Sequence, residues 1–173
     1  KHIPNQFPRV LAYSINGMVE YLKQFPGASD IKRHLTIAAD RLVSFYQKNN
    51  TSSWSWFENL LTYDNAILPQ ALIIAGITMD NEQYIKVGMK TCRFLIEETF
   101  DGDHFSFVGC KGWYQKGSKK TQFDQQPVEV ASTIMMLDAA YQLTKNHEYL
   151  SLQRKAFDWY LGENDLHIPI YDF

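Results

Sequence analysis

Apolar residues recur at helical spacing along most of the chain. Ile31, Leu35, Ala38, Leu42 and Phe45 follow one another at steps of three and four and would form one stripe on a helix. The same spacing predicts helices over residues 7–25, 30–48, 65–78, 81–98, 127–145 and 147–162. No segment alternates apolar and polar residues over a length that would build a sheet. The sequence therefore predicts an all-α fold.

Turn and capping residues lie at the ends of these predicted helices. Pro26-Gly27 would close the first helix, and Pro127 suits the first position of another. Asp80 and Asn146 precede two further helices, where an N-cap side chain would accept backbone N–H bonds. These signals support the same boundaries as the apolar pattern.

An internal repeat relates two parts of the chain. A shift of 65 residues aligns Ala66 with Ala131, Leu72 with Leu137, Ala75 with Ala140, Asn81 with Asn146, Tyr84 with Tyr149, and Phe94 with Trp159. Each copy consists of a helix, a short turn and a second helix. The segment 7–48 has the same outline with weaker residue matches. We therefore expect one domain, residues 1–173, built of about three stacked helical hairpins.

Antiparallel packing would sort the connections between helices onto two faces. The short turns at 26–29, 79–81 and 145–147 would lie on one face. The long connections at 49–64, 99–126 and 163–173 would share the other. Loops on a rigid helical scaffold are common places for binding residues, so the long-loop face is the predicted site.

Composition narrows the range of partners. Charged residues make up 21% of the chain, the net charge is −2, and Lys and Arg form no run, so no nucleic-acid partner is expected. Cys92 and Cys110 lack the spacing of a zinc site, and no apolar stretch reaches the ~20 residues of a membrane span. Neither metal, cofactor nor membrane is predicted. The chain opens at Lys1 without a signal peptide, which favours a cytoplasmic location.

The long connections are rich in aromatic side chains, carboxylates and amides. Sugar rings stack their C–H faces on indoles, and their hydroxyls pair with Asp, Asn and Gln side chains. This composition indicates a carbohydrate ligand. The alternative for Trp54 and Trp56 is that they close the end of the helical stack. Trp159 lies opposite Phe94 in the repeat and is predicted to belong to the core.

Two carboxylates occupy equivalent positions in the repeat. The 65-residue shift places Asp64 on Glu129, each near the start of a helix on the long-loop face. Glycoside cleavage uses two carboxyl groups roughly 5–9.5 Å apart, so this pair is the catalytic candidate. Glu129 has an alternative role at the third helical position, where its carboxylate would favour the helix dipole and bond back to a Gln126 cap. The alternative role of Asp64 is to cap a helix, and the alternative role of Asp124 is that of a turn residue. His104 follows a turn-like run and is expected to be inert.

Several motifs together resemble one group of proteins. They are Trp54-Ser-Trp-Phe-Glu58, Thr62-Tyr-Asp-Asn-Ala66, Gly112-Trp-Tyr114, Phe123-Asp-Gln-Gln-Pro-Val-Glu129, and the run from Ala156 to Asp165. They resemble the helical domain of bacterial proteins described as glycosyltransferases or associated with them, similar to the (α/α)6 toroids of the six-hairpin glycosidase superfamily. The resemblance covers residues 50–173 closely and the first hairpin loosely.

The resemblance implies a sugar cleft built by loops that precede inner helices. Carried over by position, its lining would be Trp54, Trp56, Glu58, Asp64, Asn65, Trp113, Asp124, Gln125, Gln126, Glu129, Asn164 and Asp165. A closed ring of six hairpins needs roughly twice this length at the ~1.5 Å rise of a helix. We therefore expect half a toroid, a fragment of a larger protein, with ends that favour self-association.

The predicted function is a carbohydrate-active domain that acts on or binds a glycan, with Asp64 and Glu129 as the catalytic pair. The alternative is a non-catalytic module that binds a glycan for a glycosyltransferase domain or partner, or holds such an enzyme in place. A purely structural helical scaffold is a third possibility, which the aromatic and polar loops disfavour.

Overall fold

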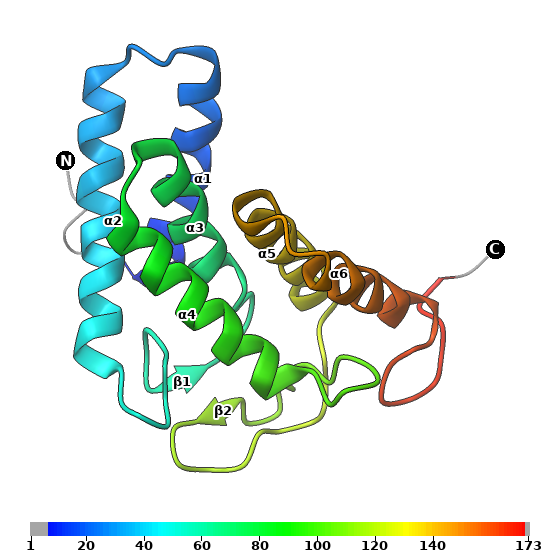
Figure 1. Cartoon of the computed structure of the whole chain (residues 1–173). Coiled ribbons are helices and arrows are strands. Elements are labelled where there is room, and N and C mark those ends of the chain that lie inside the picture. The colour runs from blue at the N-terminus through cyan, green and yellow to red at the C-terminus, as the bar shows by residue number, and fades with distance from the viewer. Residues whose placement is uncertain (1–6, 172–173) are drawn as a thin grey trace. The chain divides into compact units, whose positions relative to one another are not determined.

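The computed structural model describes residues 7–171, and helices dominate this part of the chain (Figure 1). The α-helices are α1 (Pro8–Gln24), α2 (Ser29–Asn49), α3 (Ile67–Met79), α4 (Glu82–Thr99), α5 (Pro127–Thr144) and α6 (Glu148–Asp158). A 3-10 turn, η2 (Trp159–Leu161), continues α6. Two short strands, β1 (Leu60–Leu61) and β2 (Tyr114–Gln115), lie in the long connections. The prediction of an all-α fold is confirmed.

Helix boundaries agree with the sequence prediction to within a few residues, with differences at the starts of α4 and α6. Asn81, not Asp80, caps α4, because its Oδ1 accepts the backbone N–H groups of Gln83 at 3.0 Å and Tyr84 at 3.2 Å. Asp80 has a φ of 51° and lies in the turn before the cap. The prediction for Asp80 was therefore one residue too early. Asn146 accepts the N–H of Glu148 at 3.0 Å, but the N-cap of α6 is His147, so the prediction for Asn146 was also one residue too early.

The described chain forms two compact units. Unit 1 contains residues 7–58 and 67–92, and unit 2 contains residues 59–66 and 93–171. In unit 1, α1 and α2 form a hairpin, and α3 packs against both (Figure 1). Their apolar stripes meet in a core that includes Leu11, Ile15, Leu35, Leu42 and Leu72. This core is what the periodicity of the three helices predicts.

Glycines let α3 and α4 approach each other closely in unit 1. A Cβ on Gly88 would lie 2.8 Å from Cγ1 and 2.9 Å from the backbone N of Ile73. A Cβ on Gly76 would lie 2.6 Å from Cγ1 of Ile85. These distances are shorter than a carbon contact allows, so the two glycines set the spacing of the helix pair.

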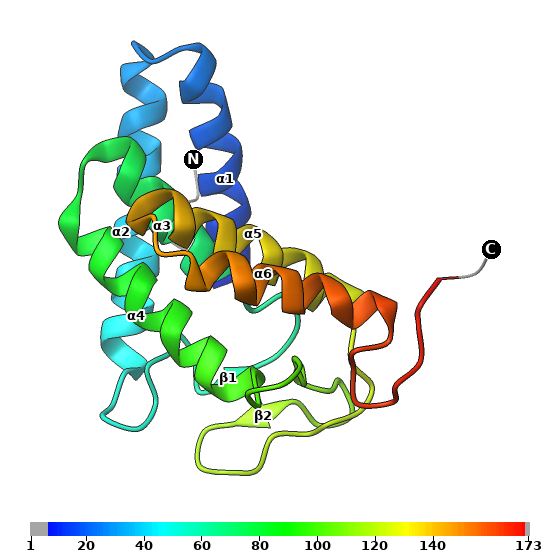
Figure 2. The ribbon, with the colours of Figure 1, turned by 45° about the vertical axis from the view of Figure 1, so that its right-hand side comes forward.

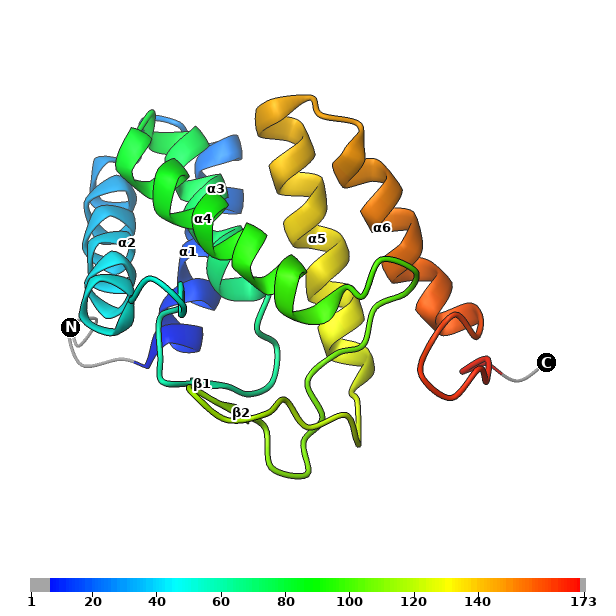
Figure 3. The same cartoon turned by 60° about the horizontal axis from the view of Figure 1, so that its bottom comes forward.

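Unit 2 combines the α5–α6 hairpin with the long connections. The two helices run side by side over most of α6 (Figures 2 and 3). Strands β1 and β2 pair antiparallel, with Leu60 opposite Gln115. Phe105 and Phe107 stack at 5.3 Å between ring centroids, and Phe107 meets Trp159 edge-on at 6.0 Å. The aromatic core therefore joins the 100–126 connection to the end of α6.

Burial supports the internal repeat. Leu72 and Leu137, Ala75 and Ala140, Tyr84 and Tyr149, and Phe94 and Trp159 are all buried, each pair in matching helices. Trp159 is thus a core residue, as the repeat predicts. Among residues 7–171, no helix has the combination of length and apolar character that a membrane crossing requires.

Candidate functional site

The long connections of unit 2 meet one another and carry most of the predicted site residues. The segment 59–66 pairs with β2 and also reaches the first turn of α5, through Asn65 and Glu129. The 100–126 connection reaches the segment after η2, through Gln125 and Asp165. Two groups of polar side chains result, one around Glu129 and one around Asp165.

Glu129 projects from the first turn of α5 toward the turn that precedes α3. One carboxylate oxygen, Oε2, lies 3.2 Å from the backbone N and 3.2 Å from Nδ2 of Asn65, and accepts both bonds. The Asn65 side chain is fixed in turn, because Oδ1 accepts the N–H of Thr62 at 3.0 Å and Nδ2 donates to the Thr62 carbonyl at 2.8 Å. Gln126 is the N-cap of α5 and Glu129 lies in the first turn, as the alternative role predicts, but the cap has no side-chain bond and the Glu129 carboxylate binds Asn65 rather than Gln126.

Asp64 lies beside the same carboxylate. Its φ of 50° is in the left-handed region, which Asp tolerates better than most residues, and its backbone N–H and that of Asn65 both face Glu129. Successive N–H groups around a left-handed residue form a concave cradle for an anion. The chain therefore binds its own Glu129 carboxylate in such a cradle.

The electrostatics of the pair favour a protonated Glu129. Burial raises the pKa of Glu129 from 4.5 to about 7, and the Asp64 charge adds to this, although the bonds from Asn65 and the Asp64 backbone oppose it. A carboxyl that holds its proton near neutral pH beside a second carboxyl has the chemistry of a general acid. Both side chains are only 2% exposed, so the pair faces no open pocket.

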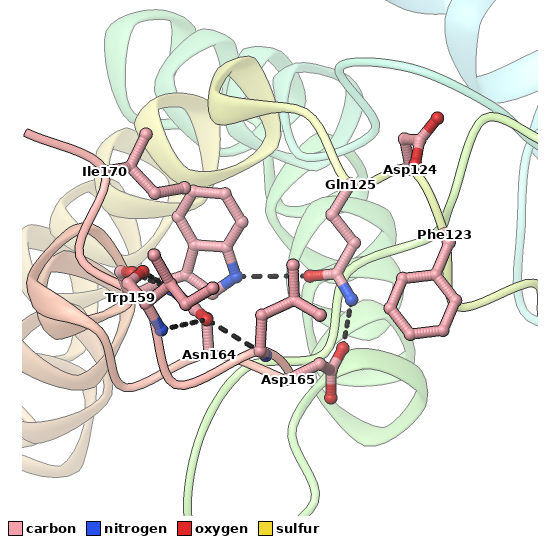
Figure 4. A pocket seen from close by; sticks show the side chains of 9 residues that line it. Phe123, Asp124, Gln125, Trp159, Asn164, Asp165 and Ile170 are labelled. Atoms are coloured by element: carbon pink, nitrogen blue, oxygen red, sulfur yellow. Dashed lines mark hydrogen bonds between the residues drawn. The ribbon is translucent and has the colours of Figure 1, made fainter.

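The second group of predicted residues lines a pocket of about 190 Å³ in unit 2 (Figure 4). Asp124 and Gln125 come from the 100–126 connection, and Asn164 and Asp165 from the segment after η2. The sequence predicted these four as binding residues in two separate loops. The rest of the lining is apolar and consists of Phe123, Trp159, Leu166, Ile168 and Ile170.

Asp165 is the most highly coordinated acid of the pocket. Its carboxylate accepts bonds from Ser106 Oγ at 2.8 Å and from the Gln125 amide, and its Oδ1 lies 3.1 Å from Nε2 of His104. Burial raises the pKa of Asp165, but the bonds from Ser106, His104 and Gln125 outweigh this and hold it below its ordinary value. The pocket therefore keeps a negative charge at neutral pH.

Gln125 and Asn164 build the pocket walls. Gln125 Oε1 accepts the indole N–H of Trp159 at 3.1 Å and the backbone N–H of Phe107 at 3.1 Å, as Figure 4 shows for Trp159. Asn164 Nδ2 donates to the carbonyls of Trp159 and Ile168, both at 2.8 Å. Both amides thus spend their bonds on the fold. The Asp124 side chain is exposed and keeps most of its acceptor sites for a ligand, whereas Asp165 already accepts three bonds and keeps about one of its four acceptor sites.

The side chains predicted to bind a sugar in the first long connection, residues 49–64, do not form an open binding surface. Trp54 and Trp56 are buried in unit 1, and the Trp54 indole donates to the carbonyl of Glu58 at 2.7 Å. The Glu58 carboxylate pairs with Arg9 at 2.7 Å. Buried indoles present no face for a sugar to stack on. The alternative, that these tryptophans stabilise the end of the helical structure, describes them better.

Trp113 and Gln126 belong to unit 2 but do not line this pocket. Trp113 is half-buried with a φ of 58°, and its carbonyl accepts bonds from the backbone and hydroxyl of Thr121. Gln126 is the half-buried residue before α5. Neither residue lines the pocket.

The apolar wall and the position of His104 were not predicted from the sequence. Leu166, Ile168 and Ile170 alternate through the segment after Asn164-Asp165, and this exposed alternation was the available signal. His104 bridges two acids, with Nδ1 3.3 Å from Asp101 and Nε2 3.1 Å from Asp165. Its sequence context shows only the nearer acid.

No protein family, curated protein or solved structure matches the chain. Within residues 7–171, no group of three or more His, Cys, Asp or Glu side chains could hold a metal ion. The chemistry of the two polar groups in unit 2 is therefore the basis for a functional proposal.

Proposed function

We propose that the chain is a carbohydrate-binding domain of the six-hairpin toroid type, which holds a sugar in the pocket of unit 2 and serves a glycosyltransferase or related enzyme. The supporting observation is the lining itself, in which two carboxylates, Asp124 and Asp165, stand beside an exposed aromatic ring, Phe123. Carboxylates accept paired sugar hydroxyls, and an aromatic ring accepts the C–H face.

The volume of the pocket and the fixed position of Asp165 both suit a small ligand. The pocket of about 190 Å³ is smaller than the roughly 300–1,000 Å³ of sites for drug-sized molecules, and suits one sugar unit. Asp165 is held in place by Ser106, His104 and Gln125, so little side-chain entropy would be lost on binding. Asp124 lies at the rim with Lys111 at 3.2 Å.

Titration of the full chain with a panel of neutral monosaccharides by calorimetry or NMR tests the binding proposal. Phe123→Ala should weaken binding by about 2- to 12-fold, the range expected for loss of about 0.5–1.5 kcal/mol of aromatic contact. Phe157→Ala is the matched control, because Phe157 is 46% exposed against 44% for Phe123 and does not line the pocket. Equal effects of the two substitutions, or no binding of any sugar, would contradict the proposal.

A second candidate function is glycoside cleavage by Asp64 and Glu129. It is favoured by the raised pKa of Glu129, about 7, next to a second carboxyl, which is the arrangement that divides acid and base roles between two carboxyls. Because both side chains are buried, the turn at 62–65 would have to open to admit a substrate.

Turnover of aryl glycosides separates the two candidates. If the domain is catalytic, Asp64→Asn and Glu129→Gln each abolish release of the aryl group without weakening sugar binding. If it is a binding module, the wild-type chain binds sugars and releases no aryl group above the rate of the buffer.

A further inference from the structure

Polar groups and aliphatic side chains both line the unit 2 pocket. Figure 4 shows Ile170 on the Trp159 side, and Phe123 and Asp124 on the Gln125 side. Leu166, Ile168 and Ile170 are 49–62% exposed, an unusual density of branched aliphatic side chains for one short surface segment. An unsubstituted sugar would satisfy the carboxylates and leave this aliphatic wall in water.

The aliphatic wall is held in a fixed conformation by hydrogen bonds. Asn164 Oδ1 accepts the backbone N–H of Leu166 at 3.1 Å, and Asn164 Nδ2 donates to the Ile168 carbonyl at 2.8 Å. The backbone N–H of Ile170 donates to the Tyr160 carbonyl at 2.8 Å. The three aliphatic side chains are therefore presented by an ordered segment whose backbone is tied to the end of α6.

The charges around the pocket limit which chemical group a sugar ligand could place against the aliphatic wall. The charged residues that line the pocket are acids, Asp124 and Asp165. Lys111 pairs with Asp124 at the rim, so the Asp165 charge is the one that would repel an anionic group on the ligand. A neutral alkyl or acyl group meets no such penalty. It would gain about fourfold in affinity for each methylene that it buries against the wall.

We propose that the preferred ligand of this pocket is a neutral sugar that carries a short alkyl or acyl substituent, with its hydroxyls on Asp124 and Asp165 and its substituent on Leu166, Ile168 and Ile170. This inference rests on the proposed sugar-binding function and adds the chemical class of the ligand. The aliphatic side chains then contribute to affinity together with the carboxylates.

Calorimetry on the full chain with matched pairs of methyl and butyl glycosides of glucose, galactose and mannose tests this inference. We expect the butyl glycoside of the preferred sugar to bind at least about tenfold more tightly than the methyl glycoside, because up to three more methylenes are buried. Ile168→Ser should remove most of this preference. Leu161→Ser should keep it, since Leu161 is exposed on η2 and does not line the pocket. Circular dichroism of both variants checks that the helices are intact.

Each remaining outcome has a distinct meaning. Equal binding of methyl and butyl glycosides would overturn the inference and leave the sugar-binding function standing. Binding of butanol as tightly as the butyl glycoside would overturn it too, because the sugar would then add nothing. Absence of binding by every glycoside would overturn the sugar-binding function itself.

Discussion

Glu129 in the first turn of α5 accepts two hydrogen bonds from Asn65, one from its backbone N–H and one from its side-chain amide, both at 3.2 Å. The two residues are 64 positions apart in the sequence, and their contact ties the turn at 62–65 to α5. Asn65 in turn closes on Thr62. The hydrogen bonds between Asn65 and Thr62 lie within the turn and cannot attach it to α5. The buried Glu129 carboxylate makes that attachment.

Removal of this carboxylate should destabilise the fold. Glu129→Ala leaves the buried N–H groups of Asn65 without their acceptor, and one unsatisfied buried group costs about 1–3 kcal/mol. Glu129→Gln retains a carbonyl oxygen at the same place and should cost less. Urea denaturation at pH 7, followed by circular dichroism, measures both free energies of unfolding. Equal stabilities of the alanine and glutamine variants would show that the hydrogen bonds to Asn65 contribute little.

Stability should also depend on the ionisation of Glu129. Its pKa is raised from 4.5 to about 7 in the folded protein, so the folded state binds this proton more tightly than the unfolded chain does. The contribution is complete below pH 4.5 and is lost as the pH rises through about 7. On the order of 2–3 kcal/mol should therefore disappear between pH 4.5 and 8.

The comparison with Glu129→Gln isolates this effect, because other titrating groups are common to both proteins. Asp165, whose pKa is lowered, acts in the opposite direction and cancels in the difference. The stability of the wild type relative to Glu129→Gln should fall as the pH rises through about 7. A difference that stays constant from pH 4.5 to 8 would contradict a raised pKa at Glu129.

The helices could be predicted from the sequence, and the internal repeat directed attention to Asp64 and Glu129. Helical periodicity is local, so Leu35 and Leu42 indicate a buried stripe without knowledge of the rest of the fold. The internal repeat carries longer-range information. It aligned Asp64 with Glu129, and in the structure these two residues do lie together.

Burial of the loop aromatics could not be predicted in the same way. The local sequence does not distinguish a loop tryptophan that stacks on a ligand from one that packs in a core. Trp54 and Trp56 proved to be buried. The contact between His104 and Asp165 spans 61 residues without any repeat to indicate it. Tertiary packing alone decides both cases.

Gln125 should be essential to the geometry of the pocket. Gln125→Ala removes the acceptor of the Trp159 indole N–H and of the Phe107 backbone N–H, which should cost about 1–3 kcal/mol. Gln125→Glu keeps an acceptor there but sets a second carboxylate against Asp165, and should be at least as harmful at neutral pH. Thermal melting of both, with Gln83→Ala on the exposed face of α4 as control, measures the effect. Recovery of Gln125→Glu at low pH would identify charge repulsion as the cause.

Two glycine substitutions in unit 1 should have opposite effects on stability. Gly88→Ala places a Cβ 2.8 Å from Cγ1 and 2.9 Å from the backbone N of Ile73, and such overpacking costs about 1–3 kcal/mol. Gly17→Ala, in α1, meets nothing within 4 Å, so the higher helix propensity of alanine should stabilise the protein by up to about 1 kcal/mol. The same change of one methyl group in a helix thus separates packing from propensity. Urea denaturation of the two variants gives both values, and a stabilised Gly88→Ala would show that α3 and α4 can move apart at little cost.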